Sequence, residues 1–265
     1  MGSCAVDVPH EMMNDAALAR AVADAAAHTL LRLRRRGRGE NLGPEGDASA
    51  NATILRALRD ARPEDAVLSE EAVDDSDRLS AARVWIIDPL DGTREYAEAG
   101  RLDWAVHVAL WSRGGLVAGA VALPGLGITL GTDRPPAVPK PGPRRLRIAI
   151  SRTRPPSFVA VLAQRLDAEL VPLGSAGYKT AAVIRGEVDA YVHAGGQYEW
   201  DSAAPVAVAQ STGLHASRLD GAPLVYNSPD PLLPDLLVCR PEFSDVMLRT
   251  TADVVGGEAP VSPAG

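Results

Sequence analysis

The chain has 265 residues, of which 46% are hydrophobic and 23% are charged, as in a globular protein of one large domain or two lobes. The net charge of −7 argues against sequence-independent binding of nucleic acid. The most apolar run, residues 116–130, contains glycines and Pro124, so we expect no membrane-spanning segment. With two cysteines and no signal peptide pattern, we expect a cytoplasmic protein with reduced thiols.

The first half of the chain predicts two helices followed by a β-sheet. Residues 1–13 show no pattern and are expected to form a mobile arm, and a helix begins at Asn14 or Asp15 and reaches the arginines near residue 36. Residues 37–46 are interpreted as a turn-rich loop, and Asp47 precedes a second helix that ends at Pro63. Strands are predicted at 66–69, 84–87, 104–111, 116–123 and 127–131, and the short turns between the last three indicate antiparallel pairing.

The second half predicts alternating strands and helices. Residues 132–145 contain five prolines and are interpreted as a boundary between lobes. Strands are predicted at 146–150, 170–173 and 188–193, and helices at 157–167, 178–185 and 202–211. We therefore expect an N-terminal α+β lobe at 14–140, a C-terminal α/β lobe at 141–255 and a tail at 256–265.

Acidic residues follow apolar segments at three places. Asp88-Pro89-Leu90-Asp91-Gly92-Thr93 follows the strand 84–87, which is predicted to end at Pro89 because proline cannot donate to a ladder. Glu70 and Glu71 follow the strand 66–69, and Asp201 follows Trp200. Carboxylate oxygens suit magnesium, and backbone amides at Gly92 and Thr93 could meet a phosphate. The alternative is an ordinary turn at the end of a strand.

The order of these motifs resembles the lithium-sensitive, magnesium-dependent phosphomonoesterases of the inositol monophosphatase superfamily, over about residues 14–240. The triplet Arg94-Glu95-Tyr96 is similar to that of the CysQ-type 3'-phosphoadenosine-5'-phosphate phosphatases, particularly their actinobacterial branch. The resemblance implies a layered αβαβα sandwich of the inositol monophosphatase and fructose-1,6-bisphosphatase type. Its N-terminal lobe would contain an antiparallel sheet and its C-terminal lobe a mixed sheet.

The resemblance also implies roles for single residues. Two magnesium ions, with a third as an option, would be held by Glu70, Asp88, the Leu90 carbonyl, Asp91 and Asp201. Asp47 and Thr93 would activate the attacking water, and Glu70 would assist catalysis. Substrate contacts are expected from Gly92, Thr93, Ser175 and Lys179. The loop at 43–46 departs from the usual pattern of the family, which leaves the role of Asp47 open.

Structural alternatives stand beside these roles. Asp47, Ser175 and Asp201 could each be a helix N-cap, and Trp200 could be a core residue. The five histidines show no zinc spacing, so we interpret them as core or surface residues.

The expected activity is magnesium-dependent removal of the 3'-phosphate of adenosine 3',5'-bisphosphate, or of its sulfated form, by a metal-activated water, with a role in sulfur assimilation. Alternative substrates are inositol monophosphate and fructose 1,6-bisphosphate. Two other classes stay open: a phosphatase with a covalent aspartyl-phosphate, and a protein that binds phosphorylated ligands without turnover. Similar proteins are often dimers, so a homodimer is one expectation.

Overall fold

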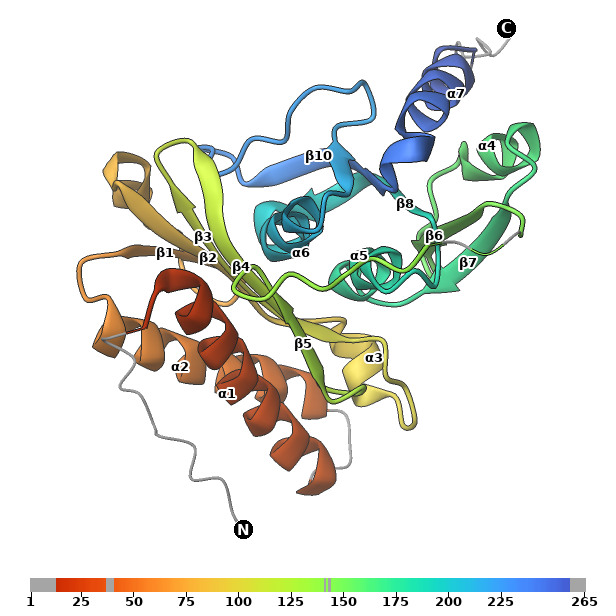
Figure 1. Ribbon diagram of the computed structural model, residues 1–265. Coiled ribbons are helices and arrows are strands. Elements are labelled where there is room, and N and C mark those ends of the chain that lie inside the picture. Colours follow the sequence, from red (N-terminus) through yellow and green to blue (C-terminus); the bar gives the residue numbers. More distant parts are fainter. Residues whose placement is uncertain (1–12, 37–40, 141, 143, 258–265) are drawn as a thin grey trace, which may run out of the picture.

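The computed structural model describes residues 13–36, 41–140, 142 and 144–257 (Figure 1). The expected arm and tail therefore lie mostly outside the described residues. The part of the chain that is expected to form the first lobe contains, in order, α1 (Asp15–Arg36), α2 (Leu42–Ala61), β1 (Ala66–Ser69), a 3-10 helix (Ser76–Ser80), β2 (Arg83–Asp91), α3 (Thr93–Ala97), β3 (Ala105–Ser112), β4 (Gly115–Leu123) and β5 (Ile128–Gly131).

The second lobe follows a connection that has no helix or strand among its described residues. It contains β6 (Arg147–Ser151), α4 (Val159–Arg165), β7 (Glu169–Leu173), α5 (Ala176–Ile184), β8 (Ala190–Tyr198), α6 (Glu199–Ser211), β9 (His215–Ser217), β10 (Leu232–Cys239), a 3-10 helix (Pro241–Phe243) and α7 (Ser244–Gly257). The elements β9, β10 and α7 were not predicted. Within the described part of the chain, no helix has the length and apolar character needed to cross a membrane.

Five layers stack in the order helix, sheet, helix, sheet, helix, which confirms the expected sandwich (Figure 1). Helices α1 and α2 cover one face of the sheet β1-β2-β3-β4-β5. Helices α5 and α6 lie between that sheet and the second sheet, β7-β6-β8-β10-β9, whose outer face packs on α4 and α7. The second sheet is mixed as expected, and the first contains one parallel pair, β1 with β2, beside its antiparallel pairs.

The side chains of β3 alternate between the two faces of the first sheet, and their sizes differ between the two faces. Val106, Val108 and Leu110 face α1 and α2, whereas the small residues Ala105 and Ala109 face the middle helices. On β4, a Cβ at Gly119 would lie 2.7 Å from the Cβ of Ala207 in α6. Small residues on this face therefore let α6 approach the sheet closely.

Two local predictions were wrong. Strand β2 does not end at Pro89 but continues to Asp91, because a register shift against β3 between Asp88 and Asp91 places the proline where no ladder bond is needed. Helix α2 begins at Leu42, so residues 42–46 are helical instead of a loop. The glycines there serve close packing: a Cβ at Gly46 would lie 2.8 Å from the ring of Tyr96.

Candidate active site

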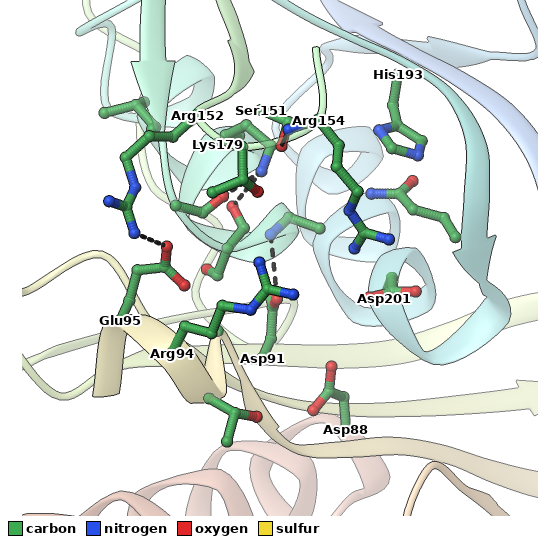
Figure 2. A pocket seen from close by; sticks show the side chains of 18 of the residues that line it. Asp88, Asp91, Arg94, Glu95, Ser151, Arg152, Arg154, Lys179, His193 and Asp201 are labelled. Carbon is green, nitrogen blue, oxygen red and sulfur yellow. Dashed lines mark hydrogen bonds and ion pairs between the residues drawn. The ribbon is translucent and has the colours of Figure 1, made fainter. Parts of the chain in front are cut away.

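A cavity of about 360 Å³ is lined by residues of β2, α3, the loop after β6, the turn before α5, β8 and α6 (Figure 2). Nine of the predicted site residues line it: Glu70, Asp88, Leu90, Asp91, Gly92, Thr93, Ser175, Lys179 and Asp201. The structure therefore brings together acids that are far apart in the sequence.

Three acids of this cavity repel one another. Asp88 is 1% exposed, and burial, with Glu70 and Asp91 nearby, raises its pKa well above the usual value. The Glu70 side chain is exposed overall, but its carboxyl group reaches Asp88, and burial of that group raises its pKa to about 7. Burial, together with the charge of Asp91, raises the pKa of Asp201 to about 7. A group of oxygen ligands with this excess of negative charge fits hard divalent cations.

Asp91 behaves differently because it is surrounded by donors. Its Oδ1 accepts the amide of Ala176 at 3.1 Å, and its Oδ2 accepts the amide of Gly177 at 2.6 Å, both at the start of α5. Burial would raise the pKa of Asp91, but the close contact with His107, the charge of Lys179 and the amide of Gly177 outweigh it and lower that pKa. Asp91 is therefore the acid of the cluster that stays ionised most readily.

The turn around Gly92 needs its glycine. The φ angle of Gly92 is +91°, and a Cβ there would lie 2.9 Å from the Cβ of Ser175. Ser175 caps α5, because its Oγ accepts the amide of Tyr178 at 3.0 Å, which confirms the capping interpretation. Lys179 is 3% exposed and its Nζ donates to the carbonyl oxygens of Gly174 and Ser175. Burial lowers the pKa of Lys179 to about 8.

Asp47 is not an N-cap, since it lies inside α2, beyond its first turn. Its side chain is 7% exposed and lies beside Thr93, but Asp47 is not among the residues that line the cavity. The Thr93 hydroxyl donates to the Leu90 carbonyl at 3.3 Å, and Oδ1 of Asp47 has no protein hydrogen-bond partner. Burial, followed by the charge of Glu71, raises the pKa of Asp47 to about 7.

Asp201 is not an N-cap either, because it lies in the first turn of α6, whose N-cap is Tyr198. Its Oδ2 accepts the backbone amide of Tyr198 at 2.7 Å and so stabilises the start of the helix from within. The ring of Trp200 stacks on the ring of Tyr198, with centroids 4.8 Å apart, and packs against the core between the sheets. Capping and cavity lining are thus combined in one carboxylate.

Sequence reasoning missed several residues of the cavity. Arg152 and Arg154 follow β6, and the Arg152 guanidinium donates to Glu95 at 2.7 Å (Figure 2). The side chains of Arg94 and Arg154 form no ion pair with any described residue, and both line the cavity. His107, interpreted above as a core or surface residue, contacts Asp91. One signal was available: Arg152 and Arg154 follow a predicted strand, as the acids do.

Comparisons with known proteins agree with this geometry. The family model described as "Inositol monophosphatase family" matches residues 10–250. The chain is 51% identical over 257 residues to the 3'-phosphoadenosine 5'-phosphate phosphatase of Mycobacterium leprae, covering 91% of this chain and 95% of that protein. It is 31% identical over 193 residues to the 3'(2'),5'-bisphosphate nucleotidase CysQ of Escherichia coli K12, covering 68% of this chain and 77% of that protein.

A solved structure shares the fold. The crystal structure of 2'AMP-bound SaIMPase-II superposes with a TM-score of 0.75 at 20% identity, covering 91% of this chain and 96% of that one. These matches confirm the resemblance and the fold expected from the sequence. The chain is therefore a phosphatase of the inositol monophosphatase family.

Proposed function

We propose that this phosphatase removes the 3'-phosphate of adenosine 3',5'-bisphosphate, and also acts on its sulfated form. The observation that carries the proposal is that acids and unpaired guanidinium groups line one cavity; we call these two sets of residues its acidic side and its cationic side. The acidic side consists of Asp88, Asp91 and Asp201. The cationic side consists of Arg94 and Arg154, whose guanidinium groups lie in the same cavity without an ion-pair partner among the described residues (Figure 2). A substrate with two separate phosphates would use both sides.

Magnesium fits the acidic side. Burial and repulsion by neighbouring acids raise the pKa values of Asp88 and Asp201, and bound divalent cations would offset both effects. We assign Glu70, Asp88, the Leu90 carbonyl, Asp91 and Asp201 as the residues that would hold two ions, with a third near Glu70 as the remaining option. When bound, divalent cations would supply positive charge and Lewis acidity at the phosphate.

The residues around the acids would position the reaction. Asp47 and Thr93 adjoin one another, and the unpartnered Oδ1 of Asp47 would accept the proton of the attacking water through the Thr93 hydroxyl. The start of α5 holds Asp91 by two amides, which leaves its carboxylate poorly suited to attack phosphorus. Direct attack by water is therefore favoured over a covalent aspartyl-phosphate, and the absence of a phosphoenzyme after acid quench would support it.

The nucleotide is favoured over inositol monophosphate because two unpaired arginines suit a second phosphate, and over fructose 1,6-bisphosphate because relatives are named for the nucleotide. The rival substrates, inositol monophosphate and fructose 1,6-bisphosphate, would occupy the same acidic side. The test is kcat/KM on the three substrates under one condition. We expect the highest value for adenosine 3',5'-bisphosphate; a higher value for either rival would reject the substrate assignment and retain the chemistry.

A further inference from the structure

His107 lies beneath the acidic side of the cavity. It is 0% exposed, and it pairs across the strands β2 and β3 with Asp88. The alternation of β3 places it on the face that meets α5 and α6, in line with the small residues Ala105 and Ala109. A large polar ring thus stands between two small apolar side chains, at the level of the strand where Asp88 lies.

Both ring nitrogens of His107 face acceptors. Nδ1 lies 3.0 Å from the carbonyl oxygen of Trp200, and because a carbonyl only accepts, Nδ1 donates. Nε2 lies 3.2 Å from Oδ2 of Asp91, a close ion-pair contact whose angle is not that of an aligned hydrogen bond. The ring therefore joins Asp91 of the first lobe to the start of α6, one residue before Asp201.

The surroundings fix the ring in this place. A Cβ at Gly177 would lie 1.9 Å from Nε2 of His107, so only glycine fits there. The amide of that same Gly177 donates to Oδ2 of Asp91. Oδ2 of Asp91 is therefore contacted by both the amide of Gly177 and the ring of His107, which leaves Oδ1, with its single amide contact, as the less occupied oxygen.

We propose that His107 is a positioning residue that fixes the orientation of Asp91 and its distance from Asp201, and so sets the affinity of the acidic site for divalent cations. The inference rests on the proposed function, in which Asp91 and Asp201 are metal ligands. Residues that orient metal ligands typically change metal affinity by about 10- to 100-fold when they are replaced.

The first test is calorimetric titration of the metal-free protein with Mn²⁺. We expect His107→Ala to bind about 10- to 100-fold more weakly than the wild type. The matched control is Val108→Ala, the next residue of β3, which is also 0% exposed but packs toward α1 and α2. This control is expected to lower the unfolding temperature without weakening Mn²⁺ binding, which separates positioning from general loss of stability.

The second test displaces the His107 ring without removing it. This test can still be carried out if the His107→Ala variant does not fold. Gly177→Ala forces the ring aside, whereas Gly115→Ala, whose Cβ would meet nothing within 4 Å, is its control. We expect weaker Mn²⁺ binding for Gly177→Ala alone. Wild-type affinity in both His107→Ala and Gly177→Ala would overturn the inference.

Two further outcomes of the Mn²⁺ titration separate a failure of the proposed function from a failure of the positioning role. If the wild type binds no Mn²⁺, the proposed function fails at its metal site, and the inference fails with it. If the wild type binds Mn²⁺ and its spin-echo spectrum shows a directly coordinated imidazole nitrogen, the proposed function stands but His107 is a ligand, which overturns the positioning role. We expect no such nitrogen coupling, because both ring nitrogens face acceptors in the protein.

Discussion

Replacement of Asp47 by asparagine is expected to stabilise the metal-free protein at pH 8 while it impairs catalysis. Asp47 is 7% exposed, and its Oδ1 has no protein hydrogen-bond partner. At pH 8 the wild type must keep a buried, poorly solvated carboxylate ionised near Glu71. Asparagine has nearly the same shape and no charge, so the fold is relieved of this cost.

The magnitude follows from the pKa of the Asp47 carboxyl group, which burial raises from 3.8 to about 7. Between these values the folded state binds more protons than the unfolded state, so the free energy of unfolding falls as the pH rises. The contribution is fully present below about pH 4 and is lost as the pH passes about 7. The difference corresponds to ~4 kcal/mol, an upper bound because the structure can relax around the charge.

The assay is urea unfolding of both proteins with a chelator at pH 5 and pH 8. The difference in the free energy of unfolding between Asp47→Asn and the wild type should grow in favour of the variant from pH 5 to pH 8 by up to ~3 kcal/mol, which is the part of the total that falls between pH 5 and the raised pKa of about 7. Because the two free energies of unfolding are subtracted, the contributions of all ionisable groups that titrate alike in both proteins cancel. A difference independent of pH would refute the reasoning, because Asp47 would then titrate alike in both states.

Other predictions concern activity. Asp91→Asn should reduce phosphate release by more than about 100-fold with an unchanged far-ultraviolet circular dichroism spectrum, since it removes a metal charge but little volume; undiminished release would remove Asp91 from the site. Arg154→Ala should raise KM for adenosine 3',5'-bisphosphate by about 10-fold and leave KM for inositol monophosphate unchanged, because only the former has a second phosphate. Equal effects on both KM values would show that Arg154 does not bind that phosphate. Lithium should inhibit turnover, as the resemblance implies, and full activity at high millimolar lithium would count against the implied mechanism.

The sequence was most informative where chemistry is carried by short motifs. The motifs identified four acids, and the structure places all of them in one cavity: Glu70, Asp88, Asp91 and Asp201. Their spatial proximity could not be predicted from their separation in the sequence, because it depends on the pairing of β1 with β2 and on the position of α6 between the two sheets. It was supplied by resemblance to a family.

The sequence was misleading where one local pattern is compatible with two different structures. The segment that contains Gly43, Pro44 and Gly46 was predicted to be a loop. The proline, however, fits the first turn of α2, and Gly43 is needed for close packing because a Cβ there would lie 2.6 Å from Thr93. His107 interrupts an apolar strand face, a pattern that many core histidines share. Only the packing of α5 and α6 on that face reveals its contacts. The lobe boundaries, the homodimer and the cytoplasmic location stay predictions.

A crystal structure of the protein soaked with Mn²⁺ and the product of the proposed reaction, adenosine 5'-phosphate, tests the central claim most directly. Anomalous scattering locates each manganese ion independently of the rest of the density. We expect peaks between Asp88, Asp91 and Asp201, with one ion also against Glu70. Ions bound only elsewhere, or the four carboxylates bound to none, would contradict it.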